Sequence, residues 1–360
     1  MIYLTTFFIT IVLFYITEVI SKKNKNLGIF LVFIASLPLA ILAGLRSLRI
    51  GTDVLVYIQP IFSLSTLVSS FSQLIQLKPD TEIGYLFLNF FISRFTSNFQ
   101  LYLFILEYII VLLFAFGLFK LRNNGSLTIG MLLFCFLLFN RSLNIARQFL
   151  AMSFVFFNLK HYFEKNNFKF IMSVIFASLF HSSSLLVLPI IYLAKVKNKI
   201  LQYILYLILF LSVVYYSQIL QVLVVNLGIL PTKYLYFINN RVDIGINYPE
   251  EMIRAIFFLF LFGYGYFNTK FFVDSKHEMN MFMIFDFILL QLGTISLNAN
   301  RIAWYFFTVY LILISRFFGQ KTQSYRMISY LILYIILLLY WWWSFVYSNY
   351  GQTYPFEFFK

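Results

Sequence analysis

The chain has 360 residues, of which 61% are hydrophobic and 11% are charged, and its formal net charge is +14. Soluble domains are about half apolar and about a quarter charged, so this composition excludes an ordinary soluble protein. Apolar runs of roughly 17–25 residues recur along the sequence, and each is long enough to cross a bilayer. Lipid offers no water to backbone polar groups, so these runs must be helices. We predict an all-α polytopic membrane protein that forms one integral membrane domain over residues 1–360.

We predict about ten membrane-spanning helices, near residues 2–20, 27–44, 99–119, 127–140, 147–163, 200–218, 251–268, 279–297, 302–316 and 327–345. The first begins without a basic flank, and we expect a helix rather than a cleavable signal peptide. Residues 170–194 are flanked by lysines and have a polar centre, "FHSSS", which favours a hairpin of two short helices. Residues 84–96 are predicted to form an amphipathic helix on the outer surface.

Positive charge orients these helices, because cytoplasmic loops of membrane proteins are enriched in lysine and arginine. With the hairpin, the most basic loops face the cytoplasm, both chain ends lie outside, and residues 45–98 and 219–250 form outward-facing loops. Eight of the eleven arginines but only three of the sixteen lysines then lie on the outer side. Arginine grips phosphate or carboxylate with two hydrogen bonds, so this enrichment indicates an anion site. Snorkelling of single arginines to lipid headgroups is the alternative.

Three arginines lie where inward-running helices are expected to begin. Arg147 lies in "NIARQF", Arg301 in "NANRIAWYF", and Arg254 has a similar place. A helix N-terminus has free backbone N–H groups and a partial positive charge, which favour a bound anion. An arginine at such a position predicts a site for pyrophosphate.

The stretch "GLRSLRIGTDVLVY" supplies two more arginines, Arg46 and Arg49, at the mouth of a predicted helix. Gly51 allows the backbone to turn. Asp53 is available to cap the following helix, so its carboxylate has a structural as well as a functional interpretation.

Two further polar residues stand out from apolar surroundings. His181 lies in "ASLFHSSSLL", and a polar side chain at membrane depth is a functional hypothesis by default. Hydrogen bonds to the following serines that stabilise the bend are the structural alternative. Glu82 precedes the amphipathic helix, where a favourable interaction with the helix dipole explains it equally well. The sequence contains no Walker loop, GxGxxG, HExxH or GxSxG motif and a single cysteine, Cys135.

Several blocks resemble the EpsG family and follow its order: "RSLRIGTDVLVY", "EIGYLFLNFFISRF", the stretch from "ARQF" to "FHSSSLLVLP", "NRIAWYF" and "YPFEFF". That family belongs with the Wzy-type polysaccharide polymerases of bacterial envelopes. The most specific pieces are the G-T-D-x-x-x-Y block that ends at Tyr57, the pair Arg147–Gln148 with the downstream A-S-L-F-H, and the final Y-P. Ile83 stands where family members usually carry proline.

The resemblance implies glycosyl transfer at the outer face of the bacterial plasma membrane. One oligosaccharide repeat moves from undecaprenyl pyrophosphate to the sugar end of another repeat, for O antigen, capsule or exopolysaccharide. The donor's pyrophosphate bond supplies the energy, so no nucleotide, metal or other cofactor is expected. The implied partners are the lipid-linked donor and acceptor, membrane lipids and a chain-length regulator protein, but no nucleic acid. A flippase for lipid-linked oligosaccharides is the main rival interpretation, and a membrane acyltransferase is a second.

In this interpretation an acceptor hydroxyl loses a proton, and Asp53, Glu82 and His181 are the outward groups that could take it. Arginines near Asp53 keep it ionised but make it a weaker base. Histidine exchanges protons near neutral pH, so we favour His181 as the base, with Asp53 as an orienting group. The expected substrate-binding residues are Arg46, Arg49, Tyr57, Glu82, Arg147, Gln148, Arg241, Arg254, Arg301 and Tyr305.

Overall fold

The computed structural model describes residues 1–121, 125–189, 193, 196, 198–228, 248–267, 276–290, 301–319 and 326–359. Within these ranges the chain is helical apart from turns and one isolated β-bridge between Arg46 and Phe358. It divides into two compact units. Unit 1 comprises Met1–Leu185 and Leu311–Lys360, and unit 2 comprises Leu186–Tyr310.

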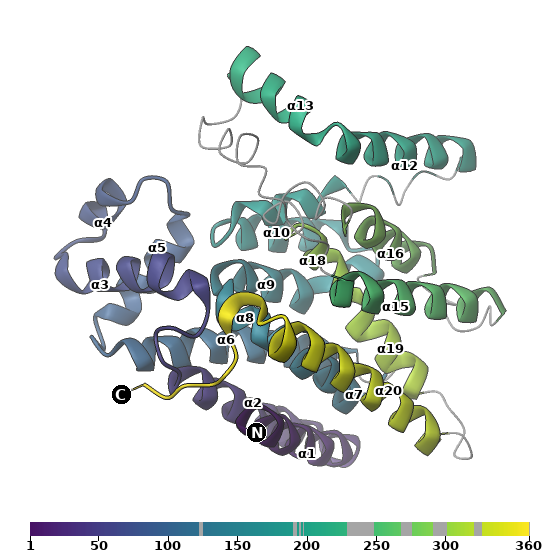
Figure 1. The fold of residues 1–360 in the computed structure, drawn as a ribbon, viewed down its shortest axis with the longest axis horizontal. Helices are drawn as coiled ribbons and strands as arrows, with labels where there is room; N and C mark the ends of the chain where they lie inside the picture. The colour runs from purple at the N-terminus through teal and green to yellow at the C-terminus, as the bar shows by residue number, and fades with distance from the viewer. Residues whose placement is uncertain are drawn as a thin grey trace. The chain divides into compact units, whose positions relative to one another are not determined.

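Unit 1 contains the first helices of the chain and the last one (Figure 1). Its helices are α1 (Ile2–Lys23), α2 (Lys25–Gly44), η1 (Val54–Ile58), α3 (Gln59–Leu67), α4 (Phe71–Leu77), α5 (Ile83–Ser93), α6 (Phe99–Lys120), α7 (Leu127–Leu133), η3 (Phe134–Phe139), α8 (Asn140–Asn144), α9 (Ala146–Phe163), α10 (Asn167–Ser178), α20 (Arg326–Trp341), η10 (Trp342–Tyr347) and η11 (Tyr350–Gln352). The 3-10 helix η4 (Ser182–Val187) begins in unit 1 and ends in unit 2. Its longer helices pack in the order α1 on α2, α2 on α6, α6 on α9, and α9 on α10.

Unit 2 contains α12 (Lys199–Val214), α13 (Tyr216–Gln221), η5 (Val222–Asn226), α15 (Tyr248–Phe267), α16 (Lys276–Leu290) and α18 (Ala303–Phe307). The helix α19 (Val309–Gly319) begins at the end of unit 2 and continues into unit 1. The helices α15, α16 and α18 pack on one another in chain order.

Five helices in the described part of the chain are long and apolar enough to cross a membrane: Ile2–Lys23, Lys25–Gly44, Phe99–Lys120, Leu127–Asn144 and Met327–Tyr347. Each falls on a predicted span. A helix of about 20 residues extends about 30 Å, which is the thickness of the hydrocarbon core of a bilayer. The all-α, polytopic fold class predicted from composition is therefore confirmed.

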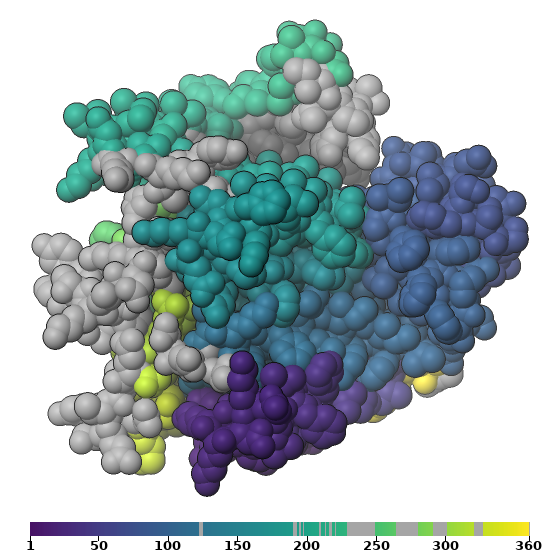
Figure 2. Space-filling model, turned by 180° about the vertical axis from the view of Figure 1, so that it is seen from behind, coloured from purple at the N-terminus to yellow at the C-terminus, as the bar shows by residue number. Residues whose placement is uncertain are grey.

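The first helix shows that lipid is the solvent for this fold. Its exposed side, which belongs to the purple surface in Figure 2, carries Phe8 and Tyr15, which are 68% and 60% exposed. Its buried side includes Thr10 and Thr17, whose hydroxyls donate to backbone carbonyls one turn earlier. A soluble helix would place polar residues outside and apolar ones inside. Here the exposed side is as apolar as the buried one, which suits a helix that faces hydrocarbon.

The predicted bend at "FHSSS" is present. The helix α10 has 12 residues and ends at Ser178, and a turn separates it from the 3-10 helix η4. Twelve residues extend about 18 Å, too short for a bilayer core of about 30 Å, which agrees with a hairpin rather than a single crossing. Residues 190–192 and 194 of the returning half, and Lys195 and Lys197 that follow it, lie outside the described residues.

The predicted amphipathic helix at 84–96 corresponds to α5, which packs on α3 and α4. It buries Tyr85, Asn89 and Ile92 and exposes Phe87 and Phe91. The exposed phenylalanines are four residues apart and therefore lie on one side of the helix.

One end of unit 1 gathers the beginning of α1, the end of α2 and the last residues of the chain. The Tyr3 hydroxyl donates to the Thr353 carbonyl at 2.5 Å, and the Phe359 N–H donates to the Leu45 carbonyl at 2.9 Å. The segments that meet here carry Arg46, Arg49, Arg141 and Arg147. We call this the arginine end.

The other end of unit 1 joins α1 to the beginning of α7. The Glu18 carboxylate accepts hydrogen bonds from the Ser126 hydroxyl and from the Thr128 N–H and hydroxyl, at 2.7–2.8 Å. It therefore caps free N–H groups at the start of α7. The helix ends here carry Lys22, Lys23, Lys120 and Lys160, and we call this the lysine end. Lysine is thus concentrated at one end of unit 1 and arginine at the other, although Arg316 lies beside Phe163 at the lysine end.

Candidate active site

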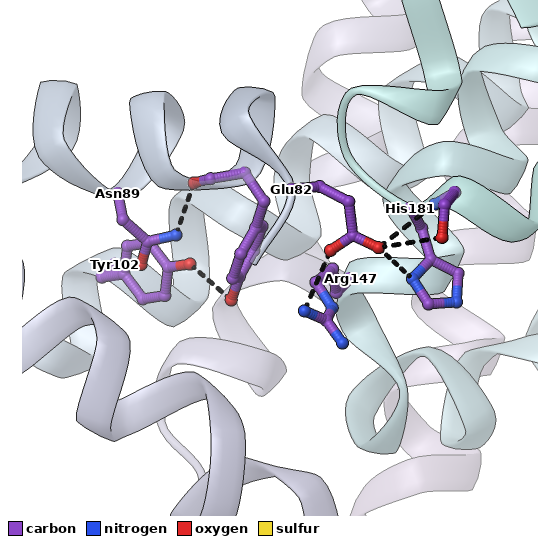
Figure 3. Close-up of polar contacts among 7 residues, drawn as sticks. Glu82, Asn89, Tyr102, Arg147 and His181 are labelled. Carbon is purple, nitrogen blue, oxygen red and sulfur yellow. Dashed lines mark hydrogen bonds and ion pairs between the residues drawn. The ribbon is translucent and has the colours of Figure 1, made fainter. Parts of the chain in front are cut away.

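Three polar residues that the sequence singled out separately meet at the arginine end of unit 1 (Figure 3). Glu82 precedes α5, Arg147 is the second residue of α9, and His181 follows α10. One Arg147 guanidinium nitrogen, Nη1, lies 3.1 Å from Glu82 Oε2. His181 Nδ1 lies 3.3 Å from the other oxygen, Oε1. We call these three residues the Glu82 cluster.

The Glu82 cluster depends on a close approach of two backbones. The Gly84 N–H donates to the Leu179 carbonyl at 2.8 Å, and the Tyr85 N–H donates to the same oxygen at 3.2 Å. A Cβ atom on Gly84 would lie 2.8 Å from both the Cβ and the carbonyl oxygen of Leu179. Only glycine fits this contact without a backbone shift. The contact brings the start of α5 against the bend after α10 and places Glu82 beside His181.

The Glu82 carboxylate is held in its ionised form. Burial opposes ionisation, but the hydrogen bond from His181 and the charge of Arg147 outweigh it and lower the pKa of Glu82 to about 2. The carboxylate also accepts from the Ser182 N–H at 3.2 Å. Glu82 is the N-cap residue of α5 but makes no side-chain cap bond. Its side-chain contacts go to α9 and to the bend after α10, while its place at the start of α5 also suits the helix dipole.

The side chains of the cluster are partly exposed. The side chains of Glu82, His181 and Arg147 are 17%, 23% and 29% exposed. Partial burial strengthens charge interactions, whereas partial exposure leaves room for a substrate to contact the groups.

Aromatic side chains support the cluster from α5 and α6. The Arg147 guanidinium lies 5.8 Å from the centre of the Tyr85 ring. The Tyr102 hydroxyl donates to the Tyr85 hydroxyl at 3.1 Å, and the Asn89 amide donates to the Tyr85 carbonyl at 2.8 Å (Figure 3). These contacts fix the orientation of Tyr85 and hence of the α5 turn that follows Glu82.

The loop that contains the G-T-D block lies against the junction of α8 and α9. Asn144 Oδ1 accepts from the Thr52 hydroxyl at 2.9 Å and from the Asp53 N–H at 3.0 Å. Gly51 has φ +92°, and a Cβ there would lie 2.7 Å from the Leu143 carbonyl oxygen. Asp53 is the N-cap residue of η1, but its side chain makes no cap hydrogen bond. The capping interpretation of Asp53 is thus not observed, and the Asn144 side chain accepts from the Asp53 N–H instead.

The C-terminal segment lies over the same loop. The Gly51 N–H donates to the Gln352 carbonyl at 3.2 Å, and the Ser47 N–H donates to the Glu357 carbonyl at 2.7 Å. Asn140 of α8 also donates to the Thr353 hydroxyl at 3.2 Å. The G-T-D, E-x-G-Y, R-Q, F-H and Y-P blocks are therefore all at the arginine end, although more than 300 residues separate the first from the last.

The predicted substrate-binding residues of unit 1 differ in their access to solvent. Arg49 and Tyr57 are exposed, the latter by 55%. Arg46 is 1% exposed and Gln148 is 3% exposed. Arg46 lies near the buried carboxylate of Glu107 and contributes to the core of this end, so its guanidinium does not face the solvent that Arg147 faces.

Unit 2 holds three of the other predicted residues. Arg254 lies six residues inside α15 rather than at a helix start, which corrects the prediction. It is 1% exposed, forms ion pairs with Glu250 and Asp286, and lies 4.2 Å from the Trp304 ring centre. Glu250 of the same helix and Asp286 of α16 neutralise the Arg254 charge. The ion pair with Asp286 links α15 to α16. Arg301 is half-buried ahead of α18, and Tyr305 is buried within it. Arg241 lies outside the described residues.

Sequence reasoning missed Gly84 and Asn144, and it considered Ser182 only as a hydrogen-bond partner of His181. Gly84 belongs to the E-x-G-Y block, and a glycine near a helix start is a signal for close backbone approach. Asn144 lies three residues before Arg147, but nothing in the sequence connects it with a loop 92 residues earlier.

A test of the Gly84 contact follows from this geometry. Gly84→Ala is expected to separate Glu82 from His181 and to lower turnover about 100-fold, because small misplacements of reacting groups have effects of this size. Product length would be measured on gels, at protein levels matched by immunoblot. The matched control is Gly263→Ala, since a Cβ at Gly263 meets nothing within 4 Å. Equal polymer from both variants would show that the contact does not position the site.

The fold and the polar cluster define a multi-pass helical membrane protein with a partly exposed carboxylate, arginine and histidine at one end of a helix bundle. The model of the EpsG family matches residues 29–358, which is nearly the whole chain. The protein belongs to the EpsG family, whose members are Wzy-type polymerase-like proteins. No curated protein and no solved structure matches the chain.

Proposed function

We propose that this protein polymerises lipid-linked oligosaccharide repeats at the outer face of the bacterial plasma membrane. It transfers a glycan from undecaprenyl pyrophosphate to the sugar end of a second repeat. Membership of the EpsG family supports a polymerase of this class. The observation that carries the proposal is the Glu82 cluster, in which one carboxylate lies against both a cation at a helix start and a histidine.

Each member of the cluster has chemistry that the transfer needs. Arg147 begins α9, where helix N–H groups and the guanidinium can stabilise the charge that develops on a leaving pyrophosphate. His181 can accept the proton of the acceptor hydroxyl. The transfer uses the bond between the donor sugar and its pyrophosphate, so the proposal requires neither nucleotide nor metal.

The segregation of basic residues supports the outward orientation. Positive charge is normally enriched on the cytoplasmic side, and lysines mark one end of unit 1. We assign the lysine end to the cytoplasm and the arginine end, with the Glu82 cluster, to the exterior. Arg49, Tyr57 and Arg301 are proposed to contact substrate as well, and a chain-length regulator is a proposed partner.

The nature of the product separates the proposal from a flippase. We expect cells that lack the protein to carry single repeats on their outer face, because export would continue without polymerisation. Loss of a flippase would leave no repeats outside. Surface glycans would be released from intact cells and sized by mass spectrometry. Absence of single repeats from the outer face would contradict the proposal.

A further inference from the structure

The two oxygens of the Glu82 carboxylate have different partners. Oε2 accepts from Arg147 Nη1 at 3.1 Å, whereas Oε1 lies 3.3 Å from His181 Nδ1 and also accepts from the Ser182 N–H. These partners come from α9 and from the bend after α10. A carboxylate is rigid and planar, so its two oxygens fix the separation of the groups that they bind. Glu82 thus joins a cation to a titratable ring through a single side chain.

We propose that Glu82 is a positioning residue that holds the proton acceptor, His181, at a fixed distance from the pyrophosphate-binding Arg147. The inference rests on the proposed glycosyl transfer. Oε1, 3.3 Å away, favours a proton on His181 Nδ1, and the neutral ring then carries its free electron pair on Nε2. The bond to Oε2 occupies only one guanidinium nitrogen, which leaves Arg147 with further N–H donors for a phosphate oxygen.

The step balances with these two groups alone. The acceptor oxygen forms a bond to the anomeric carbon of the donor glycan, and the bond from that carbon to the pyrophosphate oxygen breaks. The electron pair leaves with the pyrophosphate, beside Arg147. The hydroxyl proton moves to His181 Nε2 and passes to solvent afterwards. Glu82 takes no proton, and its negative charge stabilises the imidazolium that forms.

A purely structural role for Glu82 makes a different prediction. The start of α5 is already attached to the bend after α10 through the bonds of Gly84 and Tyr85 to the Leu179 carbonyl. Loss of the Glu82 charge leaves both bonds in place. A positioning role therefore predicts changes in proton transfer, whereas a structural role predicts changes in stability alone.

The test compares wild type with Glu82→Gln in lipid nanodiscs. The substrate is lipid-linked oligosaccharide, extracted from host cells that lack the protein. Turnover should fall roughly 100-fold, the usual size of a general-base contribution, while KM for the donor stays within about threefold. The acid limb of the pH–rate profile should move about one pH unit lower, because a neutral amide no longer stabilises the imidazolium. Glu164→Gln is the matched control, since Glu164 also lies beside a histidine, His161, but at the lysine end.

Histidine NMR provides a readout that does not depend on activity. The sequence has only three histidines, so the ring nitrogens of His181 can be assigned by substitution of the other two. Wild-type protein should show the proton on Nδ1. A wild-type ring protonated on Nε2, or normal turnover with an unmoved acid limb in Glu82→Gln, would overturn the positioning role. If either result rules out the positioning role, loss of turnover in His181→Ala in the same assay would still support the proposed polymerase function.

Discussion

Replacement of His181 by alanine is expected to lower polymerisation about 10²- to 10⁴-fold, the range for loss of a positioned general base. Its Nδ1 lies 3.3 Å from an ionised carboxylate, and its side chain is 23% exposed, so the ring is both oriented and accessible. Donor binding should persist, because the pyrophosphate contacts of Arg147 do not involve the ring. The measurement is turnover of lipid-linked repeats by purified protein, with donor affinity determined separately.

Two variants separate a catalytic from a structural histidine. His161→Ala removes a histidine that lies beside Glu164 at the lysine end and should leave turnover unchanged. His181→Gln retains hydrogen bonding but cannot act as a base. Wild-type turnover of His181→Gln would make the histidine structural and would leave Asp53 as the leading candidate for the base.

Replacement of Arg147 by lysine is expected to abolish most polymerisation, by about 10²- to 10³-fold, without loss of protein. An ammonium group is a point charge and cannot hold Glu82 with one prong and a phosphate oxygen with another. Removal of one preorganised donor to a developing negative charge has effects of this size. Polymer length in cells and turnover in nanodiscs would measure the loss.

Arg94→Lys is the matched control for this variant. Arg94 is an exposed arginine that binds the Ser65 and Val68 carbonyls outside the Glu82 cluster. Normal polymer from Arg94→Lys together with loss in Arg147→Lys would separate site chemistry from a general need for outward arginines. Near-normal polymer from Arg147→Lys and Arg301→Lys would reduce both residues to headgroup contacts.

The sequence alone predicted the helices, their approximate limits and the types of functional residue. Apolar runs in lipid have no alternative to a helix, so the spans at α1, α2, α6 and α20 could be predicted from length and hydropathy. The serines of "FHSSS" interrupt an apolar run, which predicted the bend after α10. Arg147 could be placed at a helix start because the polar residues of "NRSLN" interrupt the apolar sequence before it. These are local signals, and the chain carries them in consecutive residues.

The partners of each charge were decided only by the tertiary structure. Arg46, Arg147 and Arg254 look alike in sequence, yet Arg147 is 29% exposed beside Glu82, whereas the other two are buried. The carboxylate beside His181 is Glu82, which lies 99 residues earlier, and the glycine contact that brings it there joins two bends. Hydropathy periodicity reports which side of a helix is buried, but it carries no information about which helix covers that side. Packing of α5 against the bend after α10 therefore determined the site.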